Sequence, residues 1–174
     1  GTNWLTNGIA TGGLLAPSSA NLGDFAVATA TQDYFFVQSS GTASMTLSGL
    51  NPYQQYDLRF FGTRQATDAR NTTYSALGVN GTKSVVLQTT GTGIGAGGYN
   101  GNNNKIVDLQ DVQPQADGTL VIQVKATAPG TFGYLGILEI TGDQALTPPV
   151  QTPAEVSRWV AQDAADALPG NSVL

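Results

Sequence analysis

Apolar and polar residues alternate one by one in several short stretches of the sequence, and this pattern admits few architectures. Residues 43–47, 56–61 and 120–125 each follow it. Successive side chains of an extended strand point to opposite faces, so these stretches predict half-buried antiparallel strands. Weaker strand candidates lie at residues 25–30, 33–37, 72–79, 83–88 and 106–109.

Turn residues and one doubly apolar segment indicate how these strands connect. The Asn-Gly pair at residues 80–81 and the Asp-Gly pair at 117–118 are typical of tight hairpins, because the central residues of a type I′ turn need positive φ. Asn-Pro at residues 51–52 predicts a further turn. Residues 134–140 are apolar on both faces, which predicts a central strand. Short strands at this spacing predict an all-β fold, a jelly-roll β-sandwich of about eight strands.

The sequence changes character after residue 145. Residues 147–153 are rich in proline and threonine, which is the composition of a semi-rigid linker. Residues 153–168 place apolar side chains, Trp159 among them, at helical spacing and predict the one α-helix. We therefore expect a β-sandwich over residues 1–145, and over residues 146–174 a linker and helix that lead into a following domain. The apolar stripe of that helix must dock, and a second copy of the chain is one candidate surface.

Histidine and cysteine are both absent from the 174 residues. Without them the chain cannot build a Ser-His-Asp or Cys-His nucleophile system, a His- or Cys-ligated metal site or a disulfide. A carboxylate pair for glycoside hydrolysis would draw on the two glutamates, but Glu139 lies at a strand end and Glu155 caps the predicted helix. We therefore expect that this chain is not itself an enzyme.

The surface is expected to be polar but weakly charged. Charged residues make up 11% of the chain, against a usual ~25%, and the net charge is −5. An acidic surface repels phosphate backbones, which argues against a nucleic-acid partner. No run of ~18 apolar residues is present, so we expect no membrane span. This composition suits a secreted or cell-surface bacterial β-protein, and because Gly1 is not a natural start we expect a piece of a longer protein.

A long loop rich in glycine and asparagine, residues 90–104, is the first candidate site. Loops of this length without hydrophobic periodicity are often functional in compact domains. Asparagine amides both donate and accept hydrogen bonds, which suits sugar hydroxyls, and Tyr99 offers a stacking face for a pyranose ring. We therefore expect Tyr99, Asn100 and Asn102 to bind carbohydrate. The alternative is a decorative loop without a ligand.

A cluster of arginines is the second candidate site. Arg59, Arg64 and Arg70 lie close together in the sequence, beside Asp68. A guanidinium binds a carboxylate through two parallel hydrogen bonds, so Arg64 and Arg70 are candidates for binding a sugar, uronic acids included. The alternative is an arginine–aspartate network that rigidifies the turn. Trp4 is a further candidate sugar platform, or else an anchor at the edge of the core.

Calcium is the one cofactor for which the composition offers ligands, because it prefers oxygen donors. Asp24 and Asp33 bracket strand candidates, and Asp108 and Asp111 lie near a strand end. No calcium-loop motif is present, so a structural calcium ion stays an open alternative and no metal ligand is assigned.

Three segments together resemble a module of secreted bacterial polysaccharide-active and surface proteins. They are residues 47–78, the hairpin sequence DVQPQADGTLVIQV at 111–124, and the closing strand TFGYLGILEI at 131–140. These modules are galactose-binding-like or carbohydrate-binding-module β-sandwiches, and the resemblance covers roughly residues 20–142. The resemblance implies the fold and a polysaccharide or oligosaccharide partner. Its strand and turn signatures are specific for the fold and identify the ligand only weakly.

The tail carries a second resemblance. Residues 152–174, TPAEVSRWVAQDAADALPGNSVL, look like the lead-in to an SGNH (GDSL-like) hydrolase domain. The resemblance implies a following catalytic domain in the parent protein, a carbohydrate esterase, and no catalytic residue carries over to this chain. We therefore predict a non-catalytic carbohydrate-binding or accessory module of a secreted polysaccharide-active enzyme. The alternative is a structural spacer, adhesion or surface-layer domain that binds no sugar.

Overall fold

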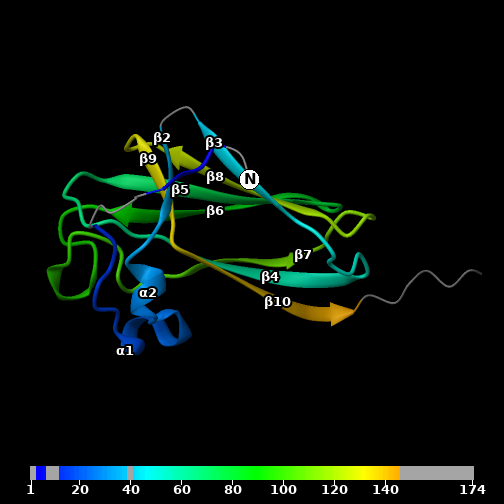
Figure 1. Cartoon of the computed structure of the whole chain (residues 1–174), viewed down its shortest axis with the longest axis horizontal. Helices are drawn as coiled ribbons and strands as arrows, with labels where there is room; N and C mark the ends of the chain where they lie inside the picture. The colour runs from blue at the N-terminus through cyan, green and yellow to red at the C-terminus, as the bar shows by residue number, and fades with distance from the viewer. Residues whose placement is uncertain (1–2, 7–11, 39–40, 146–174) are drawn as a thin grey trace, which may run out of the picture.

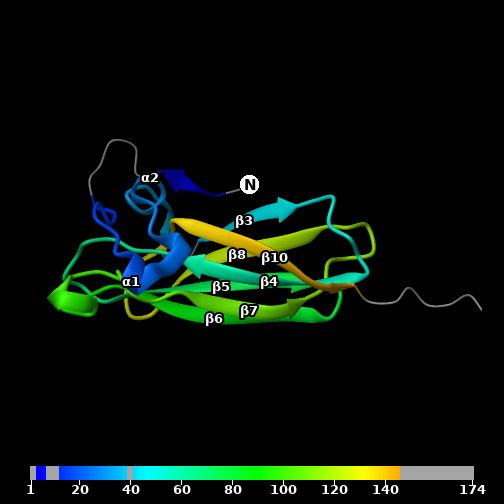
Figure 2. The same ribbon diagram turned by 90° about the horizontal axis from the view of Figure 1, so that it is seen from below.

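The computed structural model of the chain describes residues 3–6, 12–38 and 41–145. Two antiparallel sheets pack face to face, and a small third sheet lies near one end of the molecule (Figures 1 and 2). The prediction of an all-β sandwich is therefore confirmed. The predicted linker and the predicted helix at 153–168 lie outside the described residues. Within the described part of the chain, no helix has the length and apolarity needed to cross a membrane.

The larger sheet contains the strands with the clearest alternation. In β5 every second residue is buried, because one face of the strand covers the core and the other is open. The sheet has the order β3-β8-β5-β6. Its strands are β3 (Thr42–Leu47), β8 (Leu120–Thr127), β5 (Arg70–Gly78) and β6 (Gly81–Thr90).

The hairpin expected at residues 80–81 joins β5 to β6, but with a different turn. Gly78 pairs with Gly81, so Val79 and Asn80 are the turn residues. Gly81 has a φ of +100°, whereas Asn80 is not among the residues with positive φ. The hairpin is therefore confirmed and its type I′ geometry is wrong.

The facing sheet has three strands in the order β10-β4-β7. Phe60 of β4 stacks on Tyr74 of the larger sheet, with ring centroids 4.7 Å apart, at the centre of the core. Together the two sheets bury a continuous apolar layer. The strands of the facing sheet are β4 (Gln54–Phe61), β7 (Val107–Val112) and β10 (Ile137–Ala145).

Short helical turns cover the outer face of this second sheet near one end (Figure 1). Leu22 and Phe25 pack there against Phe61, and Ile137 lies against the same cluster. The strand predicted at residues 25–30 is therefore wrong: the segment buries Phe25 but exposes residues 27–29, and it has no second buried position to fill a strand face. The helical turns are α1 (Ser19–Leu22), the 3-10 turn η1 (Gly23–Phe25) and α2 (Ala28–Thr31).

The segment predicted as one central strand at 134–140 is instead two edge strands, separated at Gly136. β9 (Phe132–Leu135) pairs with β2 (Phe35–Gln38), which also pairs with β1 (Leu5–Thr6). β10 pairs with β4. Both faces of the segment are apolar because Leu138 packs on the core while Ile137 packs under the helical turns. This break brings β9 into the small sheet that carries the candidate site.

Candidate functional site

One face of the small sheet carries a cluster of aromatic rings. Phe36 of β2 lies opposite Tyr134 of β9, and Gln38 lies opposite Phe132, so these four side chains share a face. The ring of Tyr34 joins them at 5.2 Å from that of Tyr134. With two arginines they line a hollow of about 250 Å³. We call it the aromatic–arginine pocket; its lining residues are Tyr34, Phe36, Gln38, Arg64, Arg70, Phe132 and Tyr134.

The two arginines lie close to these rings. The guanidinium carbon of Arg70 lies 4.8 Å from the ring centroid of Phe132, and that of Arg64 lies 5.6 Å from Tyr34. The Nη1 of Arg64 donates to Tyr34 Oη, and the Nη1 of Arg70 donates to Tyr134 Oη. Cation–π contact and hydrogen bonding together hold both guanidinium groups in the pocket.

Asp68 balances the charge of Arg70. Its two carboxylate oxygens accept from the Nε and the Nη2 of Arg70, the latter at 2.9 Å. The hydrogen bond from Arg70 lowers the pKa of Asp68. Burial opposes the charge on Arg70, but the hydrogen bonds to Asp68 and Tyr134 outweigh it and leave the pKa of Arg70 raised. Burial likewise raises the pKa of Tyr134, against the charge of Arg70.

The backbone of Tyr134 is fixed from beneath by β5. Its N–H donates to Thr72 Oγ1 at 2.9 Å, and its carbonyl accepts from Tyr74 Oη at 2.5 Å. Gly62 leaves room for this contact, since a Cβ there would lie 2.4 Å from both Tyr134 O and Tyr74 Oη. The core of the sandwich therefore sets the position of one wall of the pocket.

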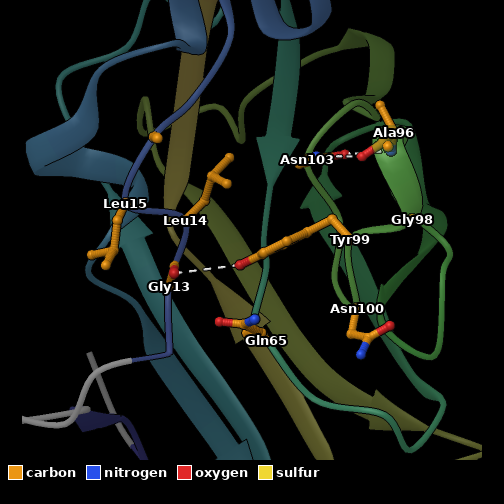
Figure 3. Close-up of a pocket in the computed structure, with 11 residues that line it drawn as sticks. Gly13, Leu14, Leu15, Gln65, Ala96, Gly98, Tyr99, Asn100 and Asn103 are labelled. Carbon is orange, nitrogen blue, oxygen red and sulfur yellow. Dashed lines mark hydrogen bonds between the residues drawn. The ribbon is translucent and has the colours of Figure 1, made fainter.

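A second hollow, of about 550 Å³, lies beside the Gly/Asn loop, residues 90–104 (Figure 3). The loop contains the 3-10 turn η2 (Ala96–Gly98) and projects Tyr99 across the hollow, where its Oη donates to Gly13 O at 3.5 Å. Leu14 and Gln65 line the same hollow. Burial raises the pKa of Tyr99, so this tyrosine is a neutral wall rather than a charged group.

The asparagine side chains of the loop form hydrogen bonds to backbone atoms, in the loop and next to it. Asn102 is 1% exposed, donates to Gly62 O and Lys105 O, and accepts from the N–H groups of Asn104 and Lys105. Asn100 is partly exposed, and its Oδ1 accepts from Gly93 N–H at 2.8 Å. A buried amide with these partners does not reach a ligand, so Asn102 shapes the loop and is not proposed to bind sugar.

The predicted site residues therefore fall in different places at the same end of the molecule. Arg64 and Arg70 line the aromatic–arginine pocket, while Tyr99 and Asn100 line the loop hollow. The two hollows are adjacent along the chain, since Arg64 lines the first and Gln65, the next residue, lines the second. The N–H of Gln65 donates to Gly12 O at 2.6 Å.

Trp4 lies on the other face of the small sheet. Its ring meets Phe35 edge-on with centroids 5.7 Å apart, and its Nε1 donates to Ser44 O at 2.8 Å. Phe35 and Phe36 are consecutive in β2 and point to opposite faces, so Trp4 is separated from the pocket by the strand itself. Its contacts are those of an anchor between the amino-terminal segment and the core.

The remaining candidates do not join the pocket. Arg59 pairs with Glu139 at 2.9 Å and lies over the ring of Phe25. Among residues 3–6, 12–38 and 41–145, no three Asp or Glu side chains gather where they could hold a metal ion. The four aspartates considered for calcium, Asp24, Asp33, Asp108 and Asp111, are thus not brought together. Glu155 lies outside the described residues.

The aromatic walls are the part of the pocket that the sequence analysis missed. Phe132 and Tyr134 alternate with Gly133 in β9, and Tyr34, just before β2, alternates with Phe36 within it, so each pair marks one face of the chain. That signal shows a shared face within each strand. It does not show that the two strands, far apart in the sequence, are neighbours.

No protein-family model matches this sequence, and comparison with curated proteins finds no match. Among solved structures, TmCBM61 in complex with β-1,4-galactotriose is 13% identical, with a TM-score of 0.46 over 82% of this chain and 90% of that chain. The CBM22-1 xylan-binding domain of Paenibacillus barcinonensis Xyn10C is 11% identical, with a TM-score of 0.40 over 82% and 87%. The insecticidal delta-endotoxin Cry8Ea1 of Bacillus thuringiensis is 13% identical, with a TM-score of 0.45 over 74% and 22%. At these values none of the three assigns a ligand or a binding residue to this chain.

Proposed function

We propose that this chain is a non-catalytic carbohydrate-binding module that works outside a bacterial cell and binds a saccharide in the aromatic–arginine pocket. The observation that carries the proposal is the combination of Phe36 and Phe132, whose rings lie 6.0 Å apart, with the hydrogen-bonding groups of Gln38, Arg64 and Arg70. A pyranose ring has an apolar C–H face that packs on aromatic carbon, and hydroxyl groups that need polar partners. Both are offered in one hollow.

The size of the pocket supports a polymer ligand that is bound from one side. Pockets that enclose a whole small molecule measure roughly 300–1,000 Å³, and this pocket measures about 250 Å³. It is too small to enclose an oligosaccharide, so most of a bound polysaccharide would run over the surface. A module of this kind would hold a linked enzyme near its polymer and raise the effective substrate concentration.

Affinity electrophoresis and calorimetry on xylan, pectin, alginate and cellulose test the proposal. Removing an aromatic wall in Phe132→Ala should weaken binding to the retained polymer by about two- to tenfold, because a lost stacking contact costs roughly 0.5–1.5 kcal/mol. Tyr53→Ala is the matched control. Tyr53 is 45% exposed but lies in the turn between β3 and β4, where β4 begins, whereas the pocket lies beyond the end of β4.

Two outcomes would contradict the proposal. A folded chain that is retained by none of the polymers would favour the spacer or adhesion domain. Equal loss of binding in Phe132→Ala and Tyr53→Ala would place the binding surface elsewhere.

The identity of a parent enzyme is a separate proposal. It rests on the resemblance of residues 152–174 to an SGNH hydrolase lead-in, and those residues lie outside the described part of the chain. An esterase as the catalytic partner is therefore proposed from the sequence alone. Reading the sequence that follows in the parent gene for a strand that ends in a Gly-x-Ser turn would test it.

A further inference from the structure

We infer that the aromatic–arginine pocket selects sugars that carry a carboxylate, uronic acid units, and that Arg64 binds this carboxylate. The inference rests on the proposed carbohydrate binding and adds the class of sugar. It is carried by the hydrogen-bonding direction of the groups in the pocket and by their net charge.

Two arginine–tyrosine pairs in the pocket present donors. A guanidinium has N–H groups and no acceptor, and Arg64 and Arg70 each donate to a phenol oxygen, of Tyr34 and Tyr134 respectively. A phenol oxygen that accepts from an arginine must direct its own hydrogen elsewhere. Both tyrosines line the pocket but are buried, so the remaining guanidinium N–H groups are the donors for a ligand, and the ligand that satisfies them is an acceptor.

The carboxylate beside these donors is already engaged. Asp68 accepts from Arg70 through both of its oxygens. The ion pairs among the described residues are Arg70–Asp68 and Arg59–Glu139, and neither includes Arg64. The cluster of Arg64, Arg70 and Asp68 therefore carries a net charge of about +1 at neutral pH, on a chain whose net charge is −5. A local positive charge on an acidic protein favours an anionic group at that point.

The N–H groups of Arg64 that the tyrosine does not use favour a carboxylate. Its guanidinium lies over the ring of Tyr34 and uses one of its five N–H groups in a hydrogen bond to a described residue. The other N–H groups of a guanidinium can donate in parallel to the two oxygens of a carboxylate. Arg70 is less available, because Asp68 occupies its Nε and Nη2 and its side chain is 14% exposed. The aromatic rings beside Arg64 would take the apolar face of the same sugar unit.

Calorimetric titration of the full chain with matched acidic and neutral oligosaccharides tests this inference. The probes are oligomers of galacturonate, guluronate and glucuronate, each compared with its methyl ester, which has the same sugar backbone without the charge. We expect at least one acid to bind about tenfold or more tightly than its ester, because hydrogen bonds between charged groups are stronger than those to a neutral ester. Raising the salt concentration should narrow the difference.

Variants of Arg64 separate charge from geometry. Arg64→Gln should abolish the preference for the acid, so that acid and ester bind this variant with affinities within about twofold of each other. Arg64→Lys keeps the charge but cannot form two parallel hydrogen bonds to a carboxylate, so this variant should retain only part of the preference for the acid. Lys125→Gln is the matched control: it makes the same change in net charge at an exposed position of β8, and it should preserve the preference.

Each other outcome overturns the inference. Esters that bind as tightly as acids, or an Arg64→Gln variant that weakens both equally, would show that the pocket does not select charge, while sugar binding would stand. A sulfated oligosaccharide bound as tightly as the best uronate would show selection of negative charge without selection of a carboxylate. If no oligosaccharide binds the folded protein, the inference and the proposed function fail together.

Discussion

A single buried amide, that of Asn102, organises the end of the Gly/Asn loop at the residue scale. The side chain of Asn102 donates hydrogen bonds to the carbonyl of Gly62, two residues before Arg64, and to that of Lys105, just after the loop. A loop without strand partners still has to satisfy its buried N–H and carbonyl groups, and asparagine supplies both a donor and an acceptor. The loop therefore keeps its shape through its own side chains.

Replacing this amide should lower the stability of the fold. Asn102→Ala leaves two backbone N–H groups and two carbonyl oxygens without the partner described above, so we expect a loss of about 1–3 kcal/mol in the free energy of unfolding. Thermal and urea unfolding measure it. Asn100→Ala is the matched control, since its Oδ1 accepts one hydrogen bond at a partly exposed position, and its effect should be smaller. Equal effects of the two variants would show that burial of Asn102 adds nothing.

The same residue shows which part of the site can be read from a sequence. The composition of the loop predicts amide chemistry, but whether an amide faces a ligand or the loop itself depends on the local fold. Arg64 and Arg70 are identified as candidates by their spacing, and the structure places them in one pocket. Phe36 and Phe132 could not be added to them from the sequence, because their neighbourhood depends on the pairing of β2 with β9.

At the scale of elements, alternation predicts strands well and their positions in the sheets poorly. β3, β4 and β8 lie where a period of two predicts them, since each has one face on the core. The segment at 134–140 differs because two separate covers, the core and the helical turns, make both of its faces apolar. An edge strand that is buried on both faces has the same apolar sequence pattern as a central strand.

Gly62, the residue directly after β4, packs so closely against β5 and β9 that it has no room for a side chain. Gly62→Ala would place a methyl group within 2.4 Å of Tyr134 O and Tyr74 Oη, so the contact between β9 and β5 must open. We expect a loss of about 1–3 kcal/mol in stability and weaker saccharide binding, because Tyr134 is displaced. Thermal unfolding and calorimetry measure the two effects.

Gly136→Ala is the matched control for this substitution. A Cβ at Gly136 would lie 3.4 Å from its nearest neighbour, Asp33 O, which is ordinary contact. This variant should stay close to the wild type in stability. If the Gly62→Ala and Gly136→Ala proteins have the same melting temperature, the close contact at residue 62 relaxes without loss of stability.

At the scale of the whole molecule, the ionisable side chains give no reason for stability to change near neutral pH. The chain has no histidine, the residue whose ordinary pKa lies between about pH 5 and 8. The resolved shifts all point away from this range: hydrogen bonds lower the pKa of Asp68 and Asp117, and burial raises the pKa of Tyr74, Tyr99 and Tyr134.

The stability of the fold should therefore be level between about pH 5 and 8 and decline on both sides. A carboxyl whose folded pKa is lowered stabilises the fold above its unfolded pKa of ~3.9, and this contribution disappears as the pH falls through the folded pKa. A tyrosine whose folded pKa is raised stabilises the fold below its unfolded pKa of ~10, and its contribution disappears as the pH rises through the folded pKa. Thermal unfolding from pH 2 to 11 measures the profile. A melting temperature that changes by more than about 5 °C between pH 5 and 8 would contradict it.

The two hydrogen bonds that hold the backbone of Tyr134 to Thr72 and Tyr74 have a consequence for selectivity. A wall that is set in place during folding does not have to be ordered when a ligand arrives, so little affinity is lost to rearrangement. The same rigidity prevents adaptation. A saccharide whose linkage directs its neighbouring units into this wall is excluded by steric clash. Free and occupied forms should then superimpose closely at β9.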